Sequence, residues 1–252
     1  MIELHNIRLS FGDRILINDA SARFECGSMV ALLGRNGTGK STLLRAMTSL
    51  GNLQGGSIII DGKSLSDINT SELARKIAFV NTERIAIDSL TVRSLVSFGR
   101  APYTDWMGSL SDDDHEAVSQ ALRSAGIEAM ADRYVDTLSD GEYQRVMIAR
   151  ALAQDTPAIL LDEPTSFLDL PNRYELCRLL AHLAHEQGKC VIFSTHELDI
   201  ALSLADSIAL VDTPNLVHLT TSEMIASGHI ERLFDSEHVS FDAQTRSIRL
   251  AK

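Results

Sequence analysis

An apolar run, a glycine-rich turn and a helix start follow one another in Val30-Ala31-Leu32-Leu33-Gly34-Arg35-Asn36-Gly37-Thr38-Gly39-Lys40-Ser41. The spacing G-x-x-x-x-G-K-S lets backbone N–H groups wrap a β-phosphate, with the positive end of a helix dipole behind them. The Lys40 ammonium would reach the β- and γ-phosphates, and the Ser41 hydroxyl would bind Mg²⁺. A turn that binds nothing is the alternative, but the position between a predicted strand and a predicted helix favours the phosphate site. We expect this site to include Gly34, Arg35, Asn36, Gly37, Thr38, Gly39, Lys40, Ser41 and Thr42.

The composition is that of a soluble globular protein, with 44% hydrophobic and 23% charged residues. A chain of 252 residues can form one large domain or two small ones. Its 23 basic and 34 acidic side chains leave a formal charge of −11. This charge works against a nonspecific grip on nucleic acid, because Lys and Arg supply most phosphate contacts. We therefore expect no nucleic-acid partner.

The cysteines and the first residues bear on the cellular compartment. Cys26, Cys177 and Cys190 are odd in number, lie far apart and lack C-x-x-C spacing, which favours a reduced cytosolic environment. Residues 1–5 read as the start of a strand rather than a signal peptide, and no run of 18 apolar residues occurs. We expect a chain that does not cross a membrane alone.

Strand and helix patterns alternate along most of the chain. Residues 2–11 and 15–26 read as strands joined at Gly12-Asp13, and 55–60 reads as a strand that ends in the Asp61-Gly62 turn. The later pattern predicts a helix over 140–154, a strand over 158–162, a helix from Pro171 to Gly188, a strand over 190–195, a helix over 197–205 and a strand over 207–211. Such alternation predicts a mainly parallel sheet covered by helices.

A helical region interrupts this alternation between the two halves of the chain. Within it, Ser111 is a good N-cap for a helix whose first turn holds Asp112-Asp113-Asp114, because carboxylates suit the positive end of a helix. The three carboxylates could instead suggest a metal site, and we favour helix capping. The predicted organisation is a single domain, 1–252, with a core of 1–81 and 138–252 and a helical subdomain of about 82–137.

Two adjacent carboxylates follow another apolar strand. Asp162 and Glu163 come directly after 158–161, at the carboxyl end of a strand, where α/β sheets bind ligands. Side chains alternate along a strand, so Asp162 would hold Mg²⁺ while Glu163 would orient the attacking water. An isolated acidic pair is commonly only a turn, but the preceding phosphate loop favours a site. His196 ends the next apolar strand, where its imidazole could reach the γ-phosphate, although such a histidine alone would indicate the core or a helix start.

Two further positions allow both a structural and a functional interpretation. Ser139 precedes an acidic first turn in Leu138-Ser139-Asp140-Gly141-Glu142-Tyr143-Gln144-Arg145, and ordinary N-capping is sufficient to explain it. A second phosphate-binding helix N-terminus is the functional alternative. Phe11, just before the Gly12 turn, is either a packing residue or a ring that stacks on adenine.

Five motifs occur in a fixed order: Gly34–Ser41, Leu138–Arg145, Leu161–Pro164, Ser166–Asp169 and Ser194–Glu197. Together they resemble the ATP-binding cassette ATPases of transporters, and the resemblance covers nearly the whole chain. It implies an α/β P-loop NTPase fold with a mainly parallel sheet core, an antiparallel β subdomain and an inserted helical subdomain. It also implies ATP and Mg²⁺ as cofactors and an ATPase that converts ATP and water to ADP and phosphate.

The resemblance implies a site shared between two copies of the chain. In this family two cassettes pair head to tail, and each ATP lies between the phosphate loop of one and the signature helix of the other. Carried over here, Ser139 and Gly141 would contact the γ-phosphate bound by the second copy, and Asp169 would serve the segment that crosses between the sites. Phe11 would correspond to the adenine-stacking aromatic residue. The catalytic residues would be Lys40, Glu163 and His196.

Two positions depart from the family pattern. A glutamine that contacts Mg²⁺ usually follows the strand corresponding to 77–80, whereas this chain has Thr82 and Glu83 in that region. Thr82 aligns best, and its hydroxyl can bind Mg²⁺ or a water, while Glu83 could substitute through a longer side chain. The signature has Asp140 and Glu142 where glycine and glutamine are commoner, which places extra negative charge near the partner's phosphate. Either departure could slow hydrolysis.

A narrower resemblance concerns the segment 98–114, which is similar to the importers of ferric siderophores, haem and cobalamin. Its aromatic and Met side chains either pack the helical subdomain or help dock a membrane subunit. The resemblance implies a homodimer beneath two integral membrane permease subunits, at the cytoplasmic face of the cell membrane. An extracytoplasmic substrate-binding protein would act indirectly. We expect the ATP-hydrolysing subunit of an importer whose specificity lies in these other subunits.

Two other classes of function are weighed against this one. A soluble cassette ATPase of translation usually carries two cassettes in one chain, and one of DNA repair carries a long coiled-coil insertion; this sequence has neither. A soluble ATPase of cluster assembly belongs to the same alternative. A nucleotide-binding regulator without turnover is disfavoured by the intact Lys40, Asp162, Glu163 and His196.

Overall fold

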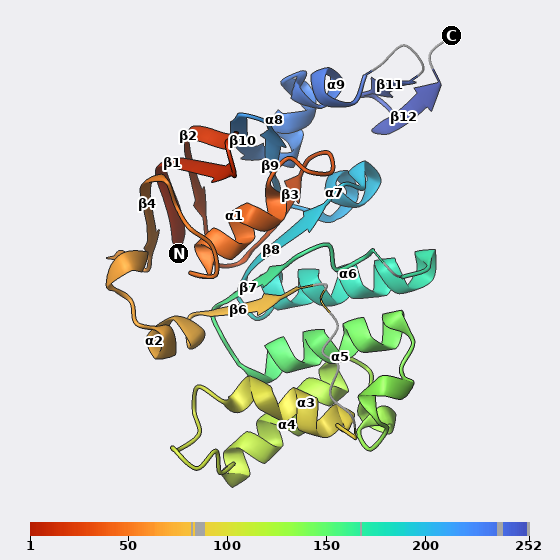
Figure 1. Ribbon diagram of the computed structural model, residues 1–252. Helices are drawn as coiled ribbons and strands as arrows, with labels where there is room; N and C mark the ends of the chain where they lie inside the picture. The colour runs from red at the N-terminus through yellow and green to blue at the C-terminus, as the bar shows by residue number, and fades with distance from the viewer. Residues whose placement is uncertain (82, 84–88, 167, 236–238, 251–252) are drawn as a thin grey trace.

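The structure is a computed structural model that describes residues 1–81, 83, 89–166, 168–235 and 239–250. Over these residues a six-stranded sheet in the order β10-β9-β3-β8-β7-β6 lies at the centre of the molecule (Figure 1). All neighbouring strands are parallel except β9 and β10, as the alternating pattern predicts. The strands are β3 Ser28–Leu33, β6 Ile77–Val80, β7 Ala158–Leu161, β8 Cys190–Thr195, β9 Ser207–Asp212 and β10 Asn215–Thr220.

An antiparallel sheet in the order β2-β1-β4-β5 forms a second layer. Its turn at Asp61 and Gly62 has φ values of 51° and 79°, as a two-residue hairpin requires, so this predicted turn is confirmed. Helix α1 (Lys40–Met47) contributes to the same apolar core as both sheets. The strands are β1 Ile2–Phe11, β2 Arg14–Phe24, β4 Gly55–Ile60 and β5 Lys63–Ser64.

Alternate side chains of β3 divide the interior into two cores. Val30 and Leu32 belong to the core shared with α1 and the antiparallel sheet, whereas Ala31 and Leu33 belong to the core shared with the other helices. All four are 0–1% exposed, as expected for a strand covered on both faces. The phosphate loop therefore leaves the sheet from a strand that is fixed on both sides.

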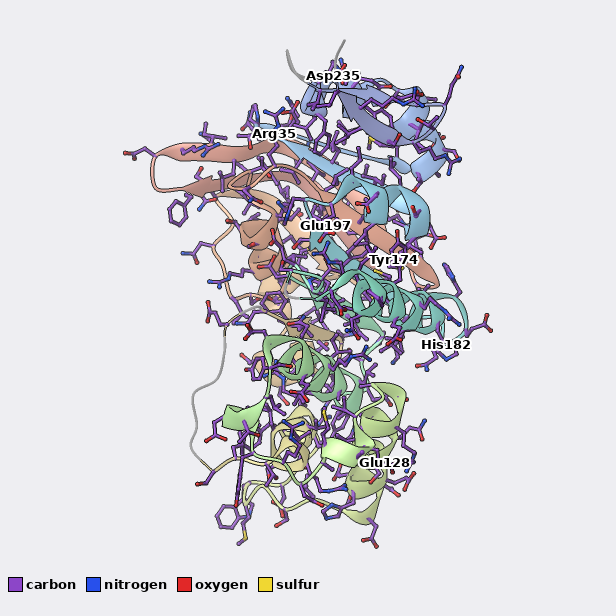
Figure 2. All side chains as sticks on the ribbon, turned by 90° about the vertical axis from the view of Figure 1, so that its right-hand side faces the viewer. Arg35, Glu128, Tyr174, His182, Glu197 and Asp235 are labelled. Carbon is purple, nitrogen blue, oxygen red and sulfur yellow. The ribbon has the colours of Figure 1, made fainter. Side chains whose placement is uncertain are left out.

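Helices cover the second face of the central sheet and extend away from it. In the view of Figure 2, Glu128 lies toward one end of the molecule and Asp235 toward the other, with Arg35 and Glu197 between them. The larger helices are α3 Val92–Ser97, α4 Asp112–Ser124, α5 Asp140–Ala153, α6 Leu170–His185 and α7 Leu198–Leu204, and 3-10 turns span Phe98–Arg100, Glu128–Met130 and Val135–Thr137.

Shorter elements complete the chain. Among the residues described, none of the helices has the length and apolar character needed to span a bilayer. His182 lies on the exposed face of α6 (Figure 2). The short elements are a 3-10 turn Leu65–Asp67, α2 Thr70–Ala74, α8 Thr221–Ala226, α9 His229–Phe234, and the hairpin of β11 Val239–Asp242 and β12 Ser247–Leu250.

The acidic triplet forms the predicted cap of α4. Ser111 Oγ accepts a hydrogen bond from the Asp114 N–H, and Asp114 Oδ2 accepts from the Ser111 N–H and hydroxyl at 3.0 and 2.7 Å. Arg100 Nε donates to Asp114 Oδ1 at 2.7 Å. These bonds, with the Ser111 hydroxyl first, lower the pKa of Asp114 to about 2. No cluster of His, Cys, Asp or Glu suited to a metal ion is found in the described ranges.

Candidate active site

The phosphate loop contains two glycines at positions that disfavour a side chain, one through its conformation and crowding and one through close approach of backbone. Gly39 has a φ of 105°, and a Cβ there would lie 3.0 Å from the Leu16 Cβ. A Cβ on Gly34 would lie 2.7 Å from the Val211 carbonyl oxygen. Gly39 is also the N-cap of α1 and offers no capping side chain, so the first N–H groups of α1 are left for a ligand. The loop therefore forms an anion site at the positive end of a helix.

The Lys40 side chain lies inside this loop and is only 5% exposed. Its Nζ donates to the carbonyl oxygens of Gly34 at 2.8 Å and Arg35 at 3.1 Å, and lies 3.9 Å from Glu163 Oε1. Burial lowers the pKa of Lys40, and the carboxylates of Glu163 and Asp162 oppose this shift. The ammonium is held where phosphate oxygens can replace the carbonyl acceptors.

Side chains from α1 and β8 meet at Asp162, which directly follows β7. Its Oδ1 accepts hydrogen bonds from Ser41 Oγ at 2.9 Å and from Ser194 Oγ at 2.7 Å. Ser194 lies on β8, between β3 and β7, and its Oγ also accepts from the Glu163 backbone N–H at 2.8 Å. The structure thus brings the two predicted metal ligands Ser41 and Asp162 together. Their hydroxyl and carboxylate oxygens are of the hard type that Mg²⁺ binds.

Glu163 points to different partners from its neighbour Asp162. Its φ of 43° is uncommon for a residue with a side chain, and such strain is often found at functional sites. Glu163 Oε2 accepts from Ser166 Oγ at 3.0 Å, and Oε1 lies 3.5 Å from His196 Nδ1. The Glu163 side chain is 28% exposed, so water can reach it. Glu163, His196 and Lys40 are therefore neighbours, and their catalytic roles remain predictions.

One cavity of about 490 Å³ collects many of the predicted binding residues. Phe11 stands at the end of β1 and is 76% exposed, so the interpretation as a packing residue is wrong. An exposed ring beside a phosphate loop suits the stacking of a base. The predicted residues that line the cavity are Phe11, Asn36, Gly37, Gly39, Lys40, Ser41, Thr42 and Glu163.

Other loop residues support this cavity without lining it. The Thr38 hydroxyl donates to the Arg35 carbonyl oxygen at 2.9 Å, and this bond within the loop helps to hold its conformation. The Arg35 side chain is exposed and lies nearer to Asp235 than to Glu128 in the view of Figure 2. Gly34 contributes its carbonyl to Lys40. Thr82, the predicted third metal ligand, lies outside the described residues.

The signature residues lie at the start of α5 and do not line the phosphate cavity. Ser139 is the N-cap of α5 in a reciprocal capping box with Glu142, so the structural interpretation of this serine is confirmed. Its role toward phosphate, and that of Gly141, stay predictions that require a second copy. Asp169 caps α6 in a similar way, accepting from the Asn172 N–H at 3.1 Å.

Residues that no sequence pattern indicates connect the segments around Glu163 and His196. Arg173 forms an ion pair with Glu197, which directly follows His196, and donates to the Leu168 carbonyl oxygen at 2.7 Å. The Thr165 hydroxyl donates to the same Glu197 carboxylate at 3.1 Å. Figure 2 places Glu197 near the centre of the molecule. The only signal in the sequence is the position of Glu197 next to a candidate histidine.

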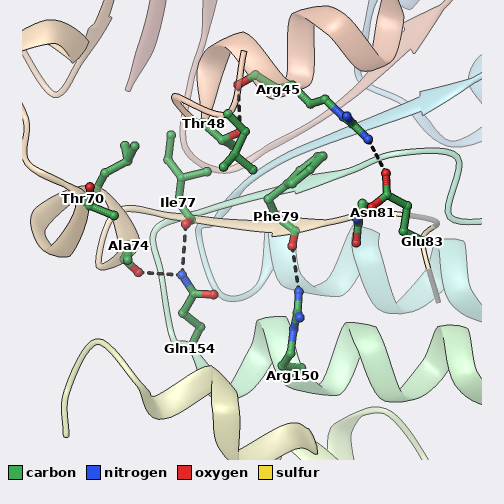
Figure 3. A pocket seen from close by; sticks show the side chains of 12 residues that line it. Arg45, Thr48, Thr70, Ala74, Ile77, Phe79, Asn81, Glu83, Arg150 and Gln154 are labelled. Carbon is green, nitrogen blue, oxygen red and sulfur yellow. Dashed lines mark hydrogen bonds and ion pairs between the residues drawn. The ribbon is translucent and has the colours of Figure 1, made fainter. Parts of the chain in front are cut away.

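A second cavity of about 640 Å³ opens between α1, α2, β6 and α5 (Figure 3). Arg150 donates to the Phe79 carbonyl oxygen at 3.2 Å, so α5 is bonded to β6 at this cavity. Glu83, one candidate for the missing glutamine, pairs with Arg45 of α1 at 2.7 Å. The Glu83 carboxylate therefore bonds to α1, the helix that follows the phosphate loop, and both residues line this cavity.

Residues 17–166 match the family model described as ABC transporter. This span contains the phosphate loop, the signature segment and the Asp162-Glu163 pair. The chain belongs to the ABC transporter family. It is 34% identical over 242 residues to the iron(3+)-hydroxamate import ATP-binding protein FhuC of Bacillus subtilis, an alignment that covers 95% of this chain and 90% of FhuC.

Two solved structures are similar to this ABC ATPase. A metal-chelate type ABC transporter in an inward-facing conformation has a TM-score of 0.82 and 28% identity, over 92% of this chain and 88% of that one. The dimeric cassette MJ0796, in a post-hydrolysis state with ADP and Pi, has a TM-score of 0.76 and 28% identity, over 88% and 99% of the two chains. The predicted family, fold and ATP-hydrolysing activity are thereby confirmed.

Proposed function

We propose that this ABC ATPase powers uptake of an iron chelate, working as a head-to-tail homodimer beneath two integral membrane permease subunits. The division of the site carries this proposal: the phosphate loop and Glu163 share one cavity, whereas Ser139 and Gly141 lie outside it. A second copy would complete the site, and the similar cassette MJ0796 is a dimer with ADP and Pi. FhuC supports an iron(3+)-hydroxamate as substrate, and the inward-facing transporter supports a metal chelate.

Hydrolysis would proceed by attack of water on the γ-phosphate of ATP. Ser41 and Asp162 would hold Mg²⁺, which when bound neutralises charge on the phosphates. Lys40 would exchange its carbonyl partners for phosphate oxygens. Glu163 would orient the water and draw its proton, and His196 beside it would hold the γ-phosphate and water in line. The products are ADP and phosphate.

The second cavity is the proposed docking groove for a permease subunit. Its lining includes apolar side chains of β6, among them Phe79, and also Leu50, which is 67% exposed. Arg45 and Glu83 supply charge at one end (Figure 3). This mixture suits an amphipathic helix that enters from the membrane. The subunit would thus be peripheral, at the cytoplasmic face, and an extracytoplasmic binding protein would deliver the chelate.

The substitution Glu163→Gln tests the proposed hydrolysis mechanism directly. Turnover should fall by at least about a hundredfold, while ATP remains bound and a closed dimer accumulates, because the carboxamide cannot accept the proton of water. ATPase assays and size determination with ATP measure the two effects. Unchanged hydrolysis would remove Glu163 from this role.

Transport is tested separately in proteoliposomes that contain the subunit and its copurified membrane partner. ATP-dependent movement of a ferric hydroxamate, lost in Glu163→Gln, is the expected result. Copurification with ribosomes or DNA in place of a multi-spanning membrane protein would favour a soluble ATPase of translation or repair.

A further inference from the structure

The start of α5 is closed by its own side chains. The Glu142 backbone N–H donates to Ser139 Oγ at 3.3 Å, and Glu142 Oε2 accepts from the Ser139 N–H at 2.8 Å and its hydroxyl at 3.0 Å. A serine hydroxyl has one proton to donate, and here Glu142 receives it. To donate to a phosphate oxygen, the Ser139 hydroxyl must turn away from Glu142.

Arg133 holds the Glu142 carboxylate from its other side. Its Nη1 donates to Glu142 Oε1 at 2.7 Å, and its Nη2 donates to the Thr137 carbonyl oxygen at 3.3 Å. The Ser139 backbone N–H, the Arg133 guanidinium and the Ser139 hydroxyl lower the pKa of Glu142. Glu142 is therefore ionised at neutral pH, with one oxygen held by the serine and the other by the arginine.

Charge at this helix end opposes the approach of a phosphate. The first turn of α5 contains Asp140 and Glu142, whose carboxylates already complement the positive end of the helix dipole. Two like charges at contact distance repel each other, and the repulsion is stronger at a protein surface than in bulk water. A guanidinium that keeps its bond to Glu142 offsets this repulsion and retains the carboxylate when Ser139 turns away.

We propose that Arg133 is a positioning residue, which neutralises and retains Glu142 so that the Ser139 hydroxyl can turn to the γ-phosphate held by a second copy of this chain. The inference rests on the proposed function, because it requires the head-to-tail dimer. Arg133 touches no substrate in this arrangement and acts through Glu142 and Ser139. A glutamine at position 142 needs no such arginine, because it is neutral and still forms a capping box.

The test uses the full chain carrying Glu163→Gln, in which the ATP-bound dimer should accumulate. Sedimentation velocity at increasing ATP concentrations gives the fraction of dimer. Addition of Arg133→Met is expected to raise the ATP concentration for half-maximal dimer about tenfold, because two such contacts close each dimer. When Glu142→Gln is also present, Arg133→Met should shift that concentration by less than about twofold.

Arg123→Met is the matched control, because Arg123 forms an exposed pair with Glu116 at 2.6 Å and should leave dimer formation unchanged. Affinity of the monomer for a fluorescent ATP analogue reports the chain's own phosphate loop, and equal values in all variants exclude misfolding. An equal shift with and without Glu142→Gln, or no shift in either, overturns the proposed role of Arg133. If the Glu163→Gln chain stays monomeric at saturating ATP, the proposed dimer fails, and this inference fails with it.

Discussion

Helices α4 and α5 begin with the same arrangement of side chains in different surroundings. In each, a serine N-cap and an acid three residues later bond to each other, and an arginine pairs with the acid at 2.7 Å. The side chains of Arg100 and Asp114 at α4 are 12% and 6% exposed, whereas those of Arg133 and Glu142 at α5 are 43% and 31% exposed. A buried pair is costly to separate, and an exposed pair contributes little stability. Burial therefore makes the arrangement at α4 structural, whereas the arrangement at α5 is accessible from solvent, as the proposed contact with phosphate requires.

The largest difference is expected when the acid is removed. Asp114→Ala would leave the Arg100 guanidinium buried without its partner, at a cost of about 3 kcal/mol in the free energy of unfolding. Glu142→Ala should cost less than about 1.5 kcal/mol, because water can solvate Arg133 and only a capping contact is lost. Urea denaturation followed by circular dichroism measures both values. Equal losses at the two helices would contradict the distinction.

Acid should weaken the cap of α4. The pKa of Asp114 is about 2, against 3.8 for the unperturbed side chain. Because the folded-state pKa is lowered, the stabilisation is complete above the unfolded pKa and is lost as the pH falls from about 4 toward 2; it amounts to about 2 kcal/mol. Asp114→Asn should remove this component, so its urea midpoint changes less than that of the wild type between about pH 6 and about pH 3. An identical pH dependence in both chains would exclude Asp114 as the source.

The smallest of these effects separates the two serines. Ser111→Ala and Ser139→Ala each remove a helix cap and should each cost about 1 kcal/mol of stability. Only Ser139→Ala should also reduce ATP turnover, by about tenfold, because a hydrogen-bond donor to the γ-phosphate is lost. ATPase assays on the two purified variants make the comparison. A similar loss of turnover in both would show that stability, rather than contact with phosphate, is responsible.

Local patterns in the sequence predict local structure well. The glycine spacing of 34–39, the Asp61-Gly62 turn and the serine cap of α4 each depend on neighbouring residues alone. Each strand and helix also follows from a local pattern, and their alternation along the chain predicts the parallel sheet. The exposure of Phe11 could not be read in this way, because it depends on where β1 ends relative to the phosphate loop.

The supporting contacts of the site could not be predicted because they join distant segments. Ser194 bonds to Asp162 because β8 lies beside β7 in the sheet, although the two residues are 32 positions apart in the chain. In the sequence Arg133 and Arg173 look like ordinary surface arginines. Their roles become visible only from the carboxylates of Glu142 and Glu197, which folding places beside them. Whether Thr82 or Glu83 replaces the family glutamine also stays a prediction.

Helix α5 connects the signature serine at its start to the proposed docking groove at its end. Its 14 residues span about 21 Å, from the Ser139 cap to the turn at Gln154. Gln154 donates to the carbonyl oxygens of Ala74 and Ile77 at the proposed docking groove (Figure 3). Because α5 joins the proposed docking groove to the signature serine, a tilt imposed on the helix at Gln154 would also move Ser139. Loading of the chelate at the membrane partner and closure of the dimer over ATP would then be coupled through this one helix.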